Sequence, residues 1–179
     1  VVRGPATLLY GANAIGGLVN VITNDIPMSP VRGTTGSLSF DAASGSREGA
    51  GAGDFSVGNG SVALHVSGSG RRAGNYQAPD GEVDNSFSRS ALGEVGLSLT
   101  RENGFVGASY AYDTSHYGIP YVEEGVTNLD PRRQVFTVRG ERRNMTGLFA
   151  GVRGSFGVRR YAHDERDGEV VATSFKNNT

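Results

Sequence analysis

The chain lacks several features that mark common protein classes. It contains no cysteine, which excludes a disulfide framework and a thiolate metal site. No run of residues approaches the ~18 consecutive apolar positions that a membrane-spanning helix needs. The 17 basic and 18 acidic residues give a net charge of −1, so the chain lacks the basic excess typical of nucleic-acid-binding proteins. Its 179 residues are enough for one domain and too few for two large ones.

A helical apolar stripe is also absent, and a two-residue rhythm takes its place after about residue 33. Alternation of apolar and polar residues is typical of strands that have one apolar face and one polar face. The sequence therefore predicts an all-β chain. The apolar members of the alternating runs are Leu38, Phe40, Val62, Leu64, Val66, Val95, Leu97, Leu99, Val106, Ala108, Tyr110, Tyr112, Phe136, Val138, Leu148, Ala150, Val152, Phe156 and Val158.

The connections between these runs are of two alternating kinds. Those at 57–61, 100–105 and 142–147 are short, and Asn-Gly, which favours hairpin turns, occurs in the first two. Those at 45–49, 73–86, 114–133 and 163–170 are mostly longer, polar and charged. Short turns at one end and long loops at the other are typical of outer-membrane barrels. Six tyrosines near the expected long-loop ends predict an aromatic girdle; they are Tyr76, Tyr110, Tyr112, Tyr117, Tyr121 and Tyr161.

The glycine-rich stretch at 11–17 invites a comparison with phosphate-binding loops. A Walker loop needs Lys and then Ser or Thr after its last glycine, whereas Leu18 and Val19 stand there. A dinucleotide fingerprint needs a helix after the glycines, and the β-branched run at 17–23 predicts a strand instead. A nucleotide site is therefore excluded.

The segment RGPATLLYGANAIGGLVNVIT at 3–23 resembles the C-terminal end of the plug domain of TonB-dependent outer-membrane receptors. The pattern is Arg-Gly-Pro, Tyr-Gly, Gly-Gly and then an apolar strand. Segments 117–120 and 161–179 also resemble parts of the barrel of these receptors. The plug-motif positions, for which we expect a structural role, are Arg3, Gly4, Pro5, Tyr10, Gly11, Ile15, Gly16, Gly17, Asn20 and Ile22.

This resemblance implies a fold, a location and partners. It implies that residues 1–32 form the end of a plug and that residues 33–179 form the N-terminal strands of an antiparallel transmembrane barrel. Such a barrel has about 22 strands when complete. We therefore expect a piece of a longer receptor in the outer membrane of a Gram-negative bacterium, surrounded by outer-membrane lipid. The TonB complex would act through a segment that this chain does not contain.

Two acidic, histidine-containing segments are candidate ligand sites. The first comprises His116, Glu123 and Glu124 with Asp130, and the second comprises His163, Asp164 and Glu165 in an expected outer loop. Imidazole and carboxylate groups together can hold a transition metal. The alternative is a solvated acidic loop, and the sequence favours it because no second histidine is near. Whether these groups bind metal stays open. His65 lies in mid-strand on the polar face, where we expect it to pack against the plug. Arg139, Arg153 and Arg159 also fall on polar faces, where we expect pairing with plug carboxylates rather than guidance of an anionic ligand.

The implied function is TonB-energised uptake of a small, scarce nutrient, with no cofactor and no nucleic acid. The chain resembles the zinc-uptake branch somewhat more than others, but the segment after 117–120 lacks that branch's histidine-rich insert. Zinc, a ferric siderophore, cobalamin and a sugar therefore remain open as ligands. A non-transport β-rich binding module or adhesin is the main alternative, and a plain porin would lack the plug signature. No catalytic constellation is present, so we do not expect an enzyme.

Overall fold

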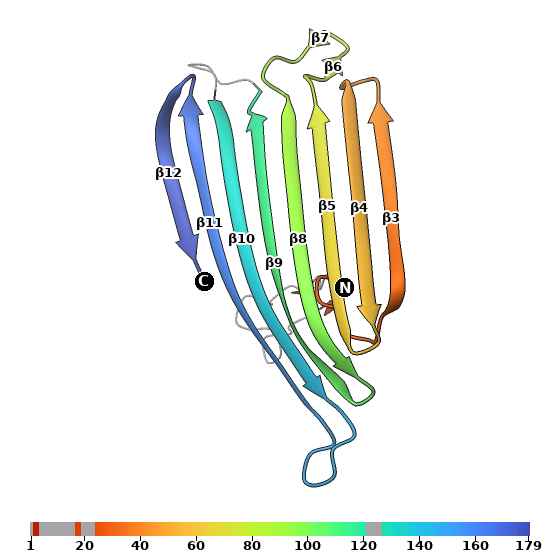
Figure 1. The fold of residues 1–179 in the computed structure, drawn as a ribbon. Coiled ribbons are helices and arrows are strands. Elements are labelled where there is room, and N and C mark those ends of the chain that lie inside the picture. Colours follow the sequence, from red (N-terminus) through yellow and green to blue (C-terminus); the bar gives the residue numbers. More distant parts are fainter. Residues whose placement is uncertain (1, 4–16, 19–23, 121–126) are drawn as a thin grey trace.

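The computed structural model describes residues 2–3, 17–18, 24–120 and 127–179. Within them, one antiparallel sheet of eight strands accounts for most of the chain, and no helix is present (Figure 1). The expectation of an all-β chain is therefore confirmed. The strands are β3 (Arg32–Ala43), β4 (Glu48–Asn59), β5 (Val62–Ala73), β8 (Ser88–Arg101), β9 (Gly104–Gly118), β10 (Thr127–Arg142), β11 (Val152–Asp167) and β12 (Val170–Asn178).

The strands follow one another in chain order across the sheet, from β3 at one edge to β12 at the other. Two small two-stranded pairs stand apart from it, β1 (Val2–Arg3) with β2 (Gly17–Leu18) and β6 (Gln77–Ala78) with β7 (Gly81–Glu82). The sheet is open, because β3 and β12 do not pair with each other. In the described part of the chain, no helix is long and apolar enough to cross a membrane.

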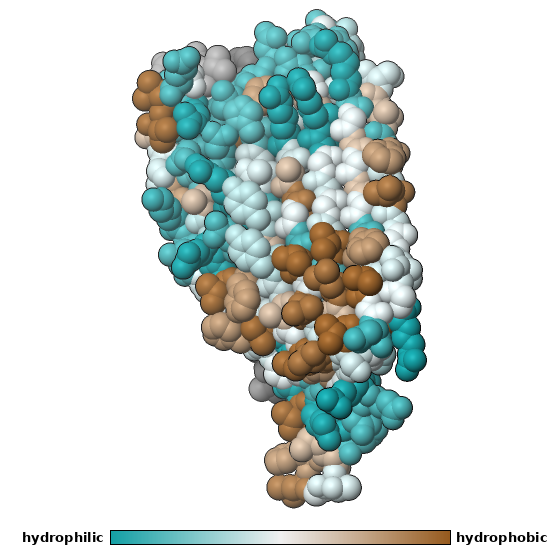
Figure 2. Space-filling model, viewed as in Figure 1, coloured by the Kyte–Doolittle hydropathy of each residue, from teal (hydrophilic) through white to brown (hydrophobic). Residues whose placement is uncertain are grey.

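The alternation expected from the sequence is realised as two chemically distinct faces. One cross-strand row, running from β4 to β10, consists of Phe55, Val66, Val95, Tyr110 and Phe136. We call the side that carries this row the apolar face. All five side chains are exposed, and Figure 2 shows apolar residues gathered in the lower part of this face, with hydrophilic residues above them.

The exposed apolar side chains on this face form the apolar band. It spans the seven strands from β3 to β11. Its members on any one strand are separated by two positions or a multiple of two, because successive residues of one face are two positions apart. Its members are Leu38, Phe40, Phe55, Val62, Val66, Val95, Leu97, Leu99, Val106, Tyr110, Tyr112, Phe136, Val152, Phe156 and Val158.

The opposite side, the polar face, is the more buried one in the middle of the sheet. Ser56, His65, Ser98, Thr100 and Ser109 lie on it and are all buried. By contrast, the buried hydrophobic residues among the described positions are only Ile26, Ala63 and Ala73. From β4 to β9 the sheet thus exposes its apolar face and covers much of its polar face, the reverse of a sheet in a soluble sandwich.

Several connections differ from the expectation. Residues 114–118 and 127–133 belong to β9 and β10, and all of 163–170 except 168–169 belongs to β11 and β12. The polar side chains in these segments do not interrupt the backbone ladder, so pairing continues through them. The connection between β10 and β11, expected to be short, occupies 143–151. The separation into a short-turn end and a long-loop end therefore holds only for part of the sheet.

The tyrosines are also divided between the two faces. Tyr110 and Tyr112 lie on the apolar face, whereas Tyr117 and Tyr161 occupy odd-numbered positions of the opposite face. Tyr76 lies in the connection between β5 and β8, and Tyr121 is outside the described residues. The expected six-tyrosine girdle is therefore wrong, because the strand alternation sends the tyrosines in both directions.

Candidate functional site

A segment that precedes the sheet lies across its polar face. Asp25, Ile26 and Pro27 in this segment, residues 24–31, are buried. The Asp25 carboxylate accepts a hydrogen bond of 2.9 Å at Oδ1 from Arg139 Nη1 and one of 3.0 Å at Oδ2 from Ser109 Oγ. These contacts tie the segment to β9 and β10. We call this arrangement the Asp25 anchor.

Two glycines make room for the segment on the polar face. A Cβ on Gly96 would lie 1.7 Å from the Asp25 carbonyl oxygen, and one on Gly107 would lie 2.4 Å from Ile26 Cγ2. Distances this short are impossible between non-bonded atoms. The close approach of residues 25–26 to β8 and β9 therefore requires glycine at both positions.

The remaining charges on the polar face are largely neutralised within the sheet. Arg71 pairs with Glu48 at 2.6 Å, Arg133 with Asp113 at 2.6 Å, and Arg153 with Glu141 at 2.8 Å. The His65 ring lies 2.8 Å from Ser56 Oγ through Nδ1. A role for Arg139 and Arg153 on the polar face was expected, and the structure pairs each of them with a carboxylate.

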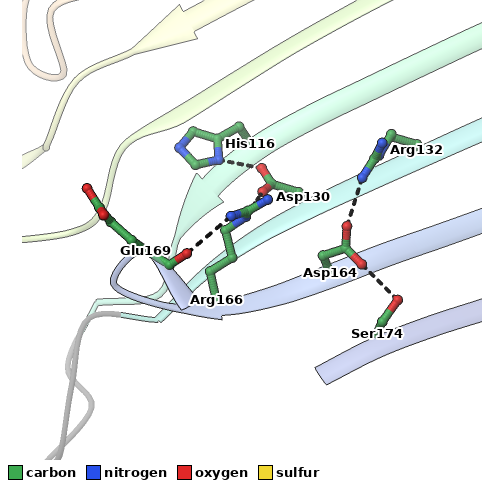
Figure 3. Close-up of polar contacts among 7 residues, drawn as sticks. All are labelled: His116, Asp130, Arg132, Asp164, Arg166, Glu169 and Ser174. Atoms are coloured by element: carbon green, nitrogen blue, oxygen red, sulfur yellow. Dashed lines mark hydrogen bonds and ion pairs between the residues drawn. The ribbon is translucent and has the colours of Figure 1, made fainter. Parts of the chain in front are cut away.

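A second polar cluster lies where β9, β10 and β11 approach their loops (Figure 3). Asp130 is held on two sides, because His116 Nδ1 lies 2.6 Å from Oδ1 and Arg166 Nε donates to Oδ2 at 2.8 Å. Asp164 accepts hydrogen bonds of 2.8 Å from both Arg132 and Ser174. We call these residues the loop-end cluster. They lie on the same side of the sheet as the apolar band and beyond its upper limit.

Both carboxylates of the loop-end cluster are stabilised in their charged form. Partial burial opposes ionisation of Asp130, but the hydrogen bonds and charges of His116 and Arg166 outweigh it and lower the pKa of this carboxyl. The hydrogen bond from Ser174 and the charge of Arg132 likewise lower the pKa of Asp164. The cluster therefore joins three strands through ionised groups at neutral pH.

The structure separates the residues of the second predicted ligand site. His163, Asp164 and Glu165 are consecutive in β11 rather than in a loop, so the alternation turns Asp164 away from the other two. His163 Nε2 lies 3.8 Å from Glu165 Oε1 on the polar face, near the rings of Tyr161 and Phe175. The expectation that these three residues share an outer loop is wrong, because β11 pairs on both sides throughout this segment.

Two members of the first predicted ligand site are described, His116 and Asp130, and they pair with each other. Glu123 and Glu124 lie outside the described residues. Over residues 24–120 and 127–179, no group of three or more histidine and acidic side chains is arranged to hold a metal ion. The described chain therefore presents ion-paired clusters, and a ligand set for a metal stays a prediction.

Two positions of the plug motif are described. Arg3 in β1 pairs with Gly17 in β2, in an antiparallel register, so the beginning of the motif lies beside Gly17 in a small sheet. The other motif positions lie outside the described residues; they are Gly4, Pro5, Tyr10, Gly11, Ile15, Gly16, Asn20 and Ile22.

Sequence reasoning missed the Asp25 anchor. Asp25 stands in a short polar stretch without periodicity, and its partner Arg139 is 114 positions away. The sequence pattern placed Arg139 on a polar face, but it did not identify Asp25 as the partner of Arg139.

When the sequence is compared with models of known protein families, no family model matches it.

Proposed function

We propose that this chain is the wall, and the adjoining plug tail, of a TonB-dependent outer-membrane receptor that takes up a scarce small nutrient. The observation that carries the proposal is the inverted burial of the sheet. On β8, Leu97 and Leu99 on the apolar face are 53% and 56% exposed, whereas Ser98 and Thr100 on the polar face of the same strand are each 1% exposed. Lipid is the solvent that favours this arrangement, because a barrel wall in a bilayer turns apolar residues outward and polar residues inward.

The direction of the apolar band supports a tilted barrel wall. The cross-strand row that contains Phe40 on β3 reaches Arg132 on β10, and the row that contains Phe156 on β11 reaches Thr34 on β3. The apolar band therefore crosses the strands obliquely. A band parallel to a membrane has this appearance when the strands are inclined to the membrane normal, as barrel strands are by about 35–45°.

The Asp25 anchor supports a plug joined to the inside of that wall. Residues 24–31 follow the segment that resembles a plug and lie on the polar face, which becomes the inside of a barrel under this proposal. An internal segment held by Arg139 and Ser109 is fixed to the wall before β3 begins. The boundary near residue 32 proposed for plug and barrel fits this geometry.

The sheet edges also fit a larger barrel. Among the described strands, β3 and β12 each pair on one side only. In hydrocarbon, unpaired backbone groups cost several kcal/mol each. Under the proposal, further strands of the receptor pair with both edges and close a barrel of about 22 strands.

Two measurements on the full-length protein test this proposal. The first is its location, for which we expect detergent-dependent extraction from the outer-membrane fraction. The second is uptake of radiolabelled zinc, ferric siderophore and cobalamin by cells with and without the gene. We expect accumulation of one of these ligands, abolished when the proton gradient is collapsed. A surface protein that binds ligand but transports none would support the adhesin or binding-module alternative.

A further inference from the structure

Unpaired cations are more numerous on the apolar face of the sheet than on the polar face. On the polar face, Arg71, Arg133, Arg139 and Arg153 each have a carboxylate partner, and Arg159 has no ion pair among the described residues. On the apolar face, seven exposed cations have no ion pair among the described residues: Arg32, Arg101 and Arg142 at the lower end of the sheet, and Arg72, Arg89, Arg160 and Lys176 in its upper part. We call the four upper residues the basic rim.

Two members of the basic rim oppose each other directly. Arg72 on β5 and Arg89 on β8 are cross-strand partners, and like charges in this position destabilise a sheet. They stand on the same face as Gly70 and Ala91, six residues beyond Val66 and Val95, which are the last members of the band on these strands. An external anion between the two guanidinium groups would remove their repulsion.

The other two members border a hollow at the β11–β12 side. Arg160 and Lys176, together with Arg132, Tyr112 and Asn178, line a cavity of about 490 Å³. Arg160 follows Val158 on the same face of β11, so the hollow begins directly where the apolar band ends. Arg132 also contributes to it while paired with Asp164.

Two acidic residues on this face lie level with the rim. The only carboxylates on the apolar-face side of the described strands are Asp130 and Asp164, and both already hold arginine partners. They lie in the cross-strand row of Arg72 and Arg89, and Asp164 also lines the hollow, so the unpaired charges of the rim are those of its cations. Arg160 lies four residues below Asp164 on β11 and so follows the oblique course of the band.

We propose that the basic rim binds the phosphate groups of anionic membrane lipids whose acyl chains lie against the apolar band. The inference rests on the membrane location in the proposed function and adds a specific lipid class. A free phosphate ion would contact the cations alone, whereas a lipid satisfies the cations and the adjoining exposed apolar surface together. Long basic side chains suit this boundary, because their stems lie along apolar surface while their charges reach the headgroups.

The test uses the full-length protein in detergent micelles that contain phosphatidylglycerol and phosphatidylcholine in equal amounts. Native mass spectrometry measures how many molecules of each lipid stay bound. We expect the wild type to retain phosphatidylglycerol in preference to phosphatidylcholine. The double variant R160Q/K176Q should lose this preference by roughly thirtyfold, because each of the two basic groups near an anionic surface contributes about 1 kcal/mol.

Two matched variants separate the rim from general effects of charge and folding. Arg159, the chain neighbour of Arg160, lies on the polar face and also has no ion pair among the described residues, so R159Q should retain the preference. The charge-preserving variant R160K/K176R should retain it as well, and circular dichroism checks that all variants are folded. Equal retention of phosphatidylglycerol by wild type and R160Q/K176Q, or equal losses in R159Q and R160Q/K176Q, overturns the inference. A full-length protein that stays soluble without detergent overturns the membrane location as well.

Discussion

Arg139 on β10 and Asp25, which lies 114 residues earlier, form a hydrogen-bonded ion pair of 2.9 Å on the polar face of the sheet. The Asp25 side chain is 8% exposed and that of Arg139 is 33% exposed. Ser109 on β9 donates to the second oxygen of the same carboxylate. One side chain thus fixes the segment before the sheet to two neighbouring strands.

The Asp25 anchor predicts a measurable coupling between its charged members. Replacement of Arg139 by Gln should lower the free energy of unfolding by about 1–3 kcal/mol, since the Asp25 carboxylate loses a charge-assisted hydrogen bond. Because Arg139 is partly exposed, we expect the decrease in the free energy of unfolding to lie toward the lower end of this range. Urea unfolding of R139Q, D25N and the double variant measures the interaction energy. Strictly additive effects of the two substitutions would contradict the anchor.

The close contact at Gly96 predicts that alanine cannot replace it without moving the anchored segment. A Cβ at this position would overlap the Asp25 carbonyl oxygen, so G96A should destabilise the protein by about 1–3 kcal/mol. It should also increase amide hydrogen exchange in residues 24–31. Gly93 on the same strand gives the control, because a Cβ there meets no atom within 4 Å. Equal exchange in G96A and G93A would rule out the packing described here.

The loop-end cluster predicts a specific acid sensitivity. The pKa of Asp130 is lowered in the folded protein, so its stabilising contribution is present above the ordinary aspartate pKa of about 3.9. That contribution is lost as the pH falls through the lowered value. D130N should be less stable than wild type at neutral pH by about 1 kcal/mol, and this difference should shrink below about pH 4.

Thermal unfolding across this pH range measures the effect. Asp80→Asn is the control, since Asp80 is exposed in the turn between β6 and β7 and has no ion pair among the described residues. If the difference between D130N and wild type does not change with pH, Asp130 does not have the role assigned to it.

The two faces of the sheet were predictable from the sequence because a strand repeats every two residues. Phe136, Val138 and Arg139 were placed on their correct sides by this period alone. The error at 163–165 has a different cause, because there the polar composition of the segment was taken to predict a loop. A backbone ladder accepts polar side chains at a sheet end, so composition did not locate the limits of β11.

The contacts that hold the site together were beyond sequence reasoning for a different reason. The pairs Asp25–Arg139 and Asp130–Arg166 join residues far apart in the chain, and they depend on the register of several strands at once. Gly96 and Gly107 were visible as glycines on a polar face, but the segment that needs their space is identified only in three dimensions.

The central claim, that the apolar face of this sheet contacts lipid while the polar face does not, has a direct test. The chain contains no cysteine, so single cysteines can be placed at positions 94, 95, 97, 98 and 99 of β8 in the full-length protein and labelled with a fluorophore. Position 96 is left as glycine because a Cβ there would overlap the Asp25 carbonyl oxygen. In vesicles of brominated phosphatidylcholine, lipid bromines should quench the labels at 95, 97 and 99 strongly and those at 94 and 98 weakly. Quenching that is equal at all five positions, or absent from all of them, would contradict the account.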